Sequence, residues 1–104
     1  MPGYIYLISE LDNDSMCKIG MTRRDKLSER LTELQTGNGD ELYVRHRFKT
    51  TKPSVLEGML HRHYASKNVH GEWFELSEEE TSKFPDVCQR YQEVIDSLED
   101  NPFF

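Results

Sequence analysis

The N-terminal part of the chain consists of two apolar segments separated by a short polar one. Residues 3–9 are rich in β-branched and aromatic side chains, which favours a buried strand. Residues 11–15 contain Asn and Asp, which tolerate a left-handed backbone and bond locally, so this stretch predicts a turn. Residues 16–21 then form the return strand. With the turn centred near its first aspartate, Tyr6 lies opposite Lys18 and both side chains point to one face of the hairpin.

Two stretches further along the chain have helical features. A leucine stripe at i, i+4 and i+7 predicts a first helix, capped by Thr22 or Asp25 and running to about Gln35. Pro53 suits the first turn of a second helix, which we expect to extend through about Tyr64.

The intervening and following segments predict further strands and a last helix. Residues 42–48 alternate between apolar and basic side chains, which predicts a half-exposed third strand. Residues 71–76 predict a short extended segment. The alternation of the third strand sets Leu42, Val44 and His46 against Tyr43, Arg45 and Arg47. Ser77-x-x-Glu80 has the form of a capping box, and we expect Pro85 to restart the helix that follows it.

Length and composition indicate a single domain covering residues 1–104. A hydrophobic content of 36% with 31% charged residues suits a small globule with a modest core. We expect residues 77–100 to be an acidic helical segment packed on this domain. The chain opens without a secretory leader, its longest apolar run is too short to cross a membrane, and Cys17 and Cys88 lack paired spacing. These features predict a cytoplasmic protein with reduced thiols and no membrane association.

The net charge of −6 argues against a polyanionic partner, but it is unevenly distributed. Residues 1–67 hold 11 Lys and Arg against 9 Asp and Glu, whereas residues 68–104 hold 2 against 10. A mildly basic body with an acidic tail can bind nucleic acid if its basic side chains share a face. Such binding should be weak and sensitive to salt.

Four polar residues occur in a distinctive order, a phenol, an ammonium, a guanidinium and a carboxylate: Tyr6, Lys18, Arg30 and Glu57. This order resembles the GIY-YIG nuclease superfamily over most of the first 76 residues. His61, one helical turn after Glu57, and the later Glu72-Trp73-Phe74 are similar to a small phage-associated branch of that superfamily. Two positions depart from the family pattern, since Tyr4 replaces its first glycine and Lys18 its second tyrosine.

The resemblance implies an α+β fold, with a small three-stranded antiparallel sheet flanked by helices. It also implies a metal-dependent endonuclease that hydrolyses phosphodiester bonds in nucleic acid, with DNA as the expected substrate. The implied cofactor is a single Mg²⁺ or Mn²⁺ ion.

Elementary chemistry assigns each candidate a role. A phenol has a pKa of about 10, and a neighbouring ammonium lowers it, so Lys18 could activate Tyr6 as a general base. The guanidinium of Arg30 matches phosphate oxygens and could clamp the transition state. Glu57 offers the hard oxygen ligand that Mg²⁺ prefers. His61 lies on the same helical face as Glu57 and could serve as an accessory polar group.

Basic residues near these candidates could position phosphates rather than read bases, and they fall at the mouth of the first helix and on the third strand: Arg23, Arg24, Lys26, Arg45 and Arg47. No zinc finger, helix-turn-helix motif or tethered basic arm follows in the sequence. Specificity would then come from substrate shape, from a homodimer or from a protein partner.

Each candidate also has a structural interpretation. Tyr6 could be an ordinary core residue, Lys18 a solvated strand residue, and Arg30 a surface side chain beside the leucine stripe. Ser54-x-x-Glu57 could be a capping box, although Pro53 at the first helical position would place Glu57 too deep for that role.

Two other classes of function stay open at this point. The chain could be a catalytically inactive relative that binds nucleic acid or a protein. It could also be a protein-interaction module that uses the aromatic residues Trp73, Phe74, Phe103 and Phe104.

Overall fold

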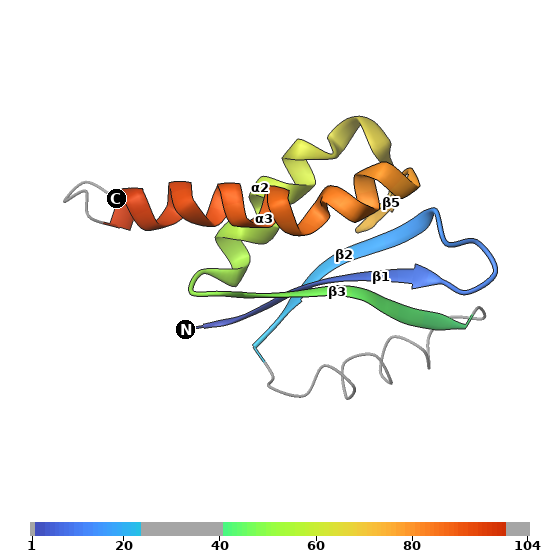
Figure 1. Ribbon diagram of the computed structural model, residues 1–104, viewed down its shortest axis with the longest axis horizontal. Helices are drawn as coiled ribbons and strands as arrows, with labels where there is room; N and C mark the ends of the chain where they lie inside the picture. Colours follow the sequence, from blue (N-terminus) through green and yellow to red (C-terminus); the bar gives the residue numbers. More distant parts are fainter. Residues whose placement is uncertain (1, 24–40, 100–104) are drawn as a thin grey trace.

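The described part of the chain forms an antiparallel sheet with two α-helices packed on one of its faces (Figure 1). The computed structural model describes residues 2–23 and 41–99. Its strands are β1 (Gly3–Glu10), β2 (Met16–Thr22), β3 (Leu42–Thr50), β4 (Asn68–His70) and β5 (Trp73–Glu75). Its helices are α2 (Pro53–His63), the short 3-10 helix η1 (Ala65–Lys67) and α3 (Glu78–Glu99). The α+β class and the second helix are therefore confirmed, whereas the expected first helix lies outside the described residues.

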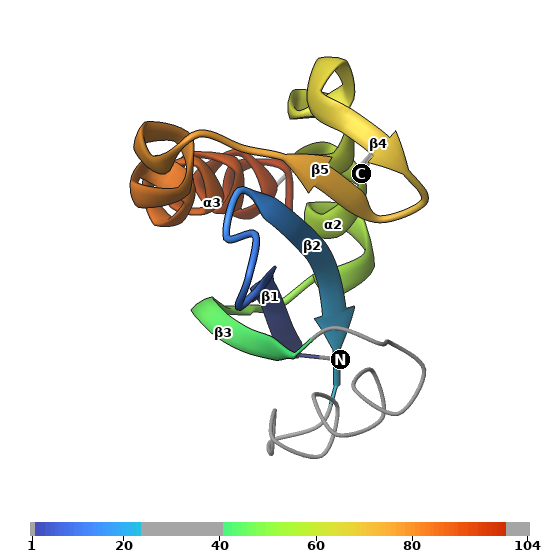
Figure 2. The same ribbon diagram turned by 90° about the vertical axis from the view of Figure 1, so that its right-hand side faces the viewer.

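The sheet has five strands in the order β3-β1-β2-β5-β4, so the expectation of three strands was wrong. The two extra strands form a small hairpin that extends the sheet beyond β2 (Figure 2). All three residues of β4 are exposed, so this strand carries no apolar alternation that a sequence could reveal. The Asn68 side-chain amide donates to the carbonyls of Gly71 and Trp73, and Gly71 closes the turn with a φ of +52°.

The register of the first hairpin differs from the expected one. Tyr6 pairs with Gly20, and Lys18 pairs with Ile8, so Tyr6 does not lie opposite Lys18. The turn is centred one residue later than expected, at Asn13, whose carbonyl accepts a hydrogen bond from the amide of Met16. That change moves every partner by two residues, which preserves the face to which a side chain points. Tyr6 and Lys18 therefore still project from the same face of the sheet.

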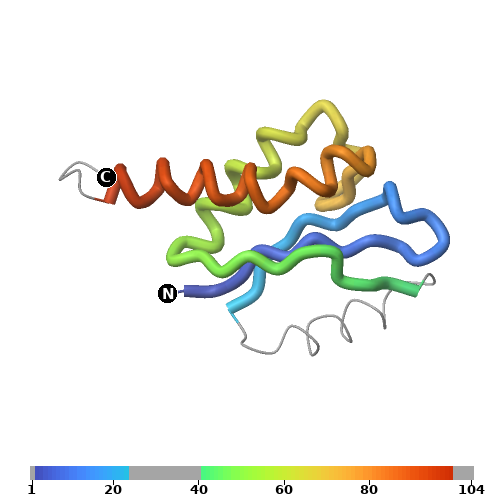
Figure 3. Tube along the Cα trace, in the orientation of Figure 1, coloured from blue at the N-terminus to red at the C-terminus, as the bar shows by residue number. Residues whose placement is uncertain are grey.

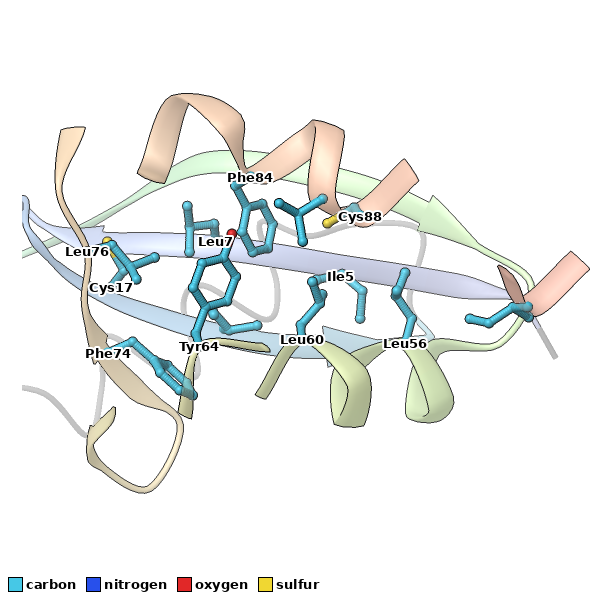
Figure 4. Close-up of a cluster of buried hydrophobic side chains, with 13 residues drawn as sticks. Ile5, Leu7, Cys17, Leu56, Leu60, Tyr64, Phe74, Leu76, Phe84 and Cys88 are labelled. Carbon is cyan, nitrogen blue, oxygen red and sulfur yellow. The ribbon is translucent and has the colours of Figure 1, made fainter. Parts of the chain in front are cut away.

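The main core lies between this sheet and the two α-helices (Figure 4). Ile5, Leu7 and Ile19 project from β1 and β2 and pack with Leu56 and Leu60 of α2. All five side chains are fully buried, and each such burial contributes about 1.5–3 kcal/mol. The chain passes directly from β3 into α2, and α3 follows β5. Both helices lie on the same face of the sheet (Figure 3). The opposite face carries a smaller cluster built on Tyr6, Ile8 and Leu42.

A bulge in β3 overturns the simple alternation expected for that strand. Leu7 pairs with His46 and Ile8 pairs with Val44, which leaves Arg45 as an extra residue between two paired positions. His46 therefore faces the helices, where its ring stacks on Phe84 with centroids 6.2 Å apart. Val44 instead packs against the Tyr6 cluster on the other face.

Helix α3 runs without interruption through Pro85, so the expected restart at that residue was wrong. The capping box is confirmed, because the Ser77 amide donates to Glu80 Oε1 and the Glu80 amide donates to Ser77 Oγ. Proline lacks the N–H that would normally bond the carbonyl of Thr81, four residues earlier. His46 Nε2 lies 3.0 Å from that oxygen and donates to it in place of the missing amide.

Both cysteines are free, as their isolated positions predicted, and both are buried. Burial raises the pKa of the Cys17 thiol, and it raises the pKa of Cys88 to about 12. Within the part of the chain that the structure describes, no helix has the length and apolar character needed to span a membrane.

Candidate nuclease site and metal centre

Tyr6 lies across the neighbouring strand, on top of Gly20. A Cβ atom added to Gly20 would lie 2.7 Å from Tyr6 Cε1 and closer still to the ring carbon and oxygen beyond it. Glycine at this position therefore makes room for the phenol ring. Tyr6 is fully buried, and it packs with Ile8 and Leu42 and against Val44 and Trp73. Tyr6 therefore has the surroundings of a core residue, as its structural interpretation predicts. Its hydroxyl lies over Gly20 of β2.

Lys18 connects this face of the sheet to the β4–β5 turn. Its Nζ lies 2.9 Å from Glu72 Oε2, and it lies 5.6 Å from the centroid of the Trp73 ring. Only 14% of the Lys18 side chain is exposed, so the ammonium is held rather than freely solvated. The interpretation of Lys18 as an ordinary solvated strand residue does not fit this environment.

Glu57 and His61 occupy one side of α2, as their spacing predicted. Lys52 is the N-cap residue of α2 and makes no side-chain cap hydrogen bond, and Ser54 lies inside the helix. The capping interpretation of Glu57 is therefore excluded. His61 Nε2 lies 2.8 Å from the carbonyl of Ile19, to which it must donate, because a carbonyl can only accept. The edge of the His61 ring also contacts Phe74, with centroids 5.1 Å apart.

Three candidate metal ligands meet where α2, β2 and the β4–β5 turn come together. One ligand atom from each of Glu57, His61 and Glu72 lies within 4.8 Å of the other two, and all three residues are partly buried. Two carboxylate oxygens and an imidazole nitrogen at this separation form a donor set that suits a divalent cation. The main chain of β2 supports the group, because the Ile19 amide donates to the carbonyl of Glu72.

Glu72 is the site residue that sequence reasoning missed. In the sequence it stands only as part of a tripeptide that resembles the phage-associated branch, with no role of its own. Its position follows from the pairing of Trp73 with Lys18 across β5 and β2, which places the preceding residue beside α2. An expected pairing of the extended segment 71–76 with β2 would have been the signal that found it.

The structure separates the two arginines expected on β3. Arg45 binds Glu78 of α3 through two contacts of 2.9 and 3.1 Å and donates to the Tyr43 hydroxyl, so its guanidinium is already engaged. Arg47 is exposed, pairs with Tyr6 and stacks over the ring of Tyr4 at 4.9 Å. Only Arg47 of this pair therefore lies on the Tyr6 face.

The remaining predicted residues divide into two groups. Arg23 is exposed at the end of β2, where its guanidinium lies 3.3 Å from Ser54 Oγ on α2. Three predicted residues lie outside the described part of the chain: Arg24, Lys26 and Arg30. The structure thus brings Lys18, Glu57 and His61 together with Glu72, with Tyr6 above the neighbouring stretch of β2.

The fold and the site define a small α+β domain in which two carboxylates and an imidazole, candidate ligands for a divalent cation, lie beside a partly buried lysine. The chain belongs to the T5orf172 domain family, whose pattern matches residues 3–89. This is a phage-associated family in the context of GIY-YIG-like and HNH endonucleases, which makes a nuclease or DNA-binding role plausible. Comparison with curated proteins and with solved structures found no match.

Proposed function

We propose that this protein is a metal-dependent endonuclease of the GIY-YIG type that hydrolyses phosphodiester bonds in nucleic acid, with DNA as the first expected substrate. The observation that carries the proposal is the convergence of Glu57, His61 and Glu72 within 4.8 Å, with Lys18 paired to Glu72. The family context and the order of polar residues along the chain both support it.

Glu57 would hold the divalent cation, Mg²⁺ or Mn²⁺, with the partly buried position of its helix favouring a fixed carboxylate. Once bound, such a cation would stabilise the negative charge that develops on the phosphate. His61 would provide an accessory polar group next to Glu57. Its ring is held in position by the hydrogen bond to the Ile19 carbonyl.

Tyr6 would act as general base and Lys18 would favour its ionised form. Lys18 and Tyr6 project from the same face, and Trp73 contacts both the Tyr6 cluster and the Lys18 ammonium. Because Tyr6 is fully buried, its use as a base requires the cluster around it to open when substrate binds. Arg30 remains the proposed transition-state clamp on sequence grounds.

Exposed basic residues would position the nucleic acid backbone, and Arg23 and Arg47 are the described residues best placed to do so. Arg45 would contribute less, because Glu78 already neutralises it. The acidic helix α3 packs on the face of the sheet opposite Tyr6, so its negative charge lies away from Arg47, which projects from the Tyr6 face.

The test is nicking of supercoiled plasmid DNA with Mg²⁺ or Mn²⁺, compared between wild-type protein and Glu57→Gln at equal folded concentration. Removing one well-placed electrostatic group typically lowers the rate by about 10²–10³-fold, and we expect a loss of that size. Glu75→Gln is the matched control, because Glu75 is an exposed glutamate of β5 outside the ligand group. Equal nicking by Glu57→Gln and wild type would assign the activity to a contaminant.

The complete burial of Tyr6 favours a second candidate, a catalytically inactive module that binds nucleic acid or a protein partner. Salt-sensitive binding of DNA without cleavage under any metal would identify a nucleic-acid-binding module. The aromatic interaction surface is less well supported, since Phe74 is buried in the main core. A cytoplasmic location and a homodimer or other partner that provides specificity also stay predictions.

A further inference from the structure

We propose that Glu57, His61 and Glu72 together form a three-ligand site that prefers a divalent transition metal, represented by Mn²⁺, to Mg²⁺. The sequence predicted one protein ligand, Glu57, and the structure adds an imidazole nitrogen and a second carboxylate within 4.8 Å. The proposal deepens the endonuclease function. It rests on that function only for the use of the metal in cleavage, and metal binding can be measured without it.

The hydrogen bond of His61 occupies one ring nitrogen and leaves the other with its lone pair available to a metal. Nε2 donates to the carbonyl of Ile19 at 2.8 Å, so the lone pair of the neutral ring is on Nδ1. Metal-binding histidines are typically oriented in this way, through a bond from the other ring nitrogen to a carbonyl or carboxylate. Contact with Phe74 fixes the ring further. Imidazole nitrogen suits transition metals, whereas Mg²⁺ favours oxygen ligands, so His61 sets the preference.

Glu72 provides the second carboxylate and is at present paired with Lys18 at 2.9 Å. Two carboxylates as close as those of Glu57 and Glu72 repel each other, and the Lys18 ammonium reduces that repulsion. A divalent cation between the carboxylates would replace the ammonium with a larger charge. Lys18 would then be released beside Trp73, on the face from which Tyr6 projects. The divalent cation and the Lys18 ammonium therefore compete for the carboxylate of Glu72, and binding of the cation releases Lys18.

The experiment measures the affinities of Mn²⁺ and Mg²⁺ by titration calorimetry, with free Mn²⁺ followed by electron paramagnetic resonance. We expect wild type to bind Mn²⁺ at least tenfold more tightly than Mg²⁺. Glu72→Gln should weaken Mn²⁺ binding at least tenfold, and the control Glu75→Gln should leave it unchanged. Lys18→Met should tighten Mn²⁺ binding severalfold, because the competing partner of Glu72 is removed.

Mn²⁺ binding by Glu72→Gln that equals that of wild type would overturn the three-ligand site and leave a Glu57-dependent nuclease intact. The expected affinities without any cleavage would instead overturn the nuclease and support the site. Weaker Mn²⁺ binding by Lys18→Met would contradict the competition at Glu72. Urea unfolding of each variant checks its fold, and Glu72→Ala replaces Glu72→Gln if the latter does not fold.

Discussion

Substitution of Gly20 by alanine tests the placement of Tyr6 directly. The new Cβ would lie 2.7 Å from Tyr6 Cε1 and closer still to Cζ and the hydroxyl oxygen, whereas ordinary contacts begin near 3.4 Å. Tyr6 is fully buried and cannot swing into solvent, so the ring and its neighbours must shift. Overpacking of this kind costs about 1–3 kcal/mol, and the loss of backbone freedom in the unfolded chain returns about 0.4–1 kcal/mol. The difference between these terms is the net effect, and we expect Gly20→Ala to lower the free energy of unfolding by about 1–2 kcal/mol.

Gly58 offers a matched control, because it lies inside α2 and, among the described residues, an added Cβ would meet only the Arg62 guanidinium, at 3.4 Å and beyond. Gly58→Ala should raise the free energy of unfolding by about 0.5–1 kcal/mol, as for glycine in a helix interior. Urea unfolding followed by circular dichroism measures both variants. With a urea dependence of about 1–2 kcal/mol per M, the midpoints should move apart by more than 1 M.

The reasoning fails if Gly20→Ala is as stable as wild type or more stable. A second comparison locates the cause, since leucine at position 6 lacks the two ring carbons and the hydroxyl oxygen that would clash. In a Tyr6→Leu background, Gly20→Ala should cost clearly less than it does in wild type. An equal cost in both backgrounds would show that the strand itself, rather than the phenol, requires glycine.

Two further predictions concern stability. Burial raises the pKa of Cys88 from 9.0 to about 12, because the folded protein favours the neutral thiol. The neutral thiol therefore contributes its full stability to the folded state below pH 9, and this contribution is lost as the pH rises towards 12. Between pH 8 and 10, the free energy of unfolding measured in urea should fall by about 1 kcal/mol because of this thiol, with a smaller contribution from Tyr64. The same fall with pH in Cys88→Ala as in wild type would contradict this. His46→Phe keeps the ring but removes the donor to Thr81, so it should cost about 1–2 kcal/mol by thermal unfolding. In a Pro85→Ala background, residue 85 has an amide that can bond the Thr81 carbonyl, so the loss of stability caused by His46→Phe should be smaller. An equal loss in both backgrounds would show that His46 does not replace the missing amide of Pro85.

Local patterns in the sequence predicted the elements whose determinants lie within them. The β-branched residues of β1 and the proline that opens α2 predicted both elements correctly, and the spacing of Glu57 and His61 placed them on one side of α2. The reciprocal bonds of Ser77 and Glu80 likewise depend only on neighbouring residues.

The errors concern features that depend on contacts between distant segments. The exact centre of the first turn and the bulge at Arg45 are set by pairing between strands, so alternation alone could not reveal them. Strand β4 has no buried residue, and its place in the sheet depends on β5. Glu72 entered the site only because β5 pairs with β2, a contact between residues far apart in the sequence.

One peptide segment of β2 holds two sides of the candidate metal centre. The amide of Ile19 donates to the Glu72 carbonyl, and the carbonyl of Ile19 accepts a hydrogen bond from His61 Nε2. Both contacts use main-chain atoms, so they are independent of which side chain occupies position 19. That side chain points into the core, and exchanging it for another aliphatic residue would alter packing while leaving both anchors in place. The spacing of the candidate ligands is consequently set by the main chain of β2, and any aliphatic residue that fits the core at position 19 preserves it.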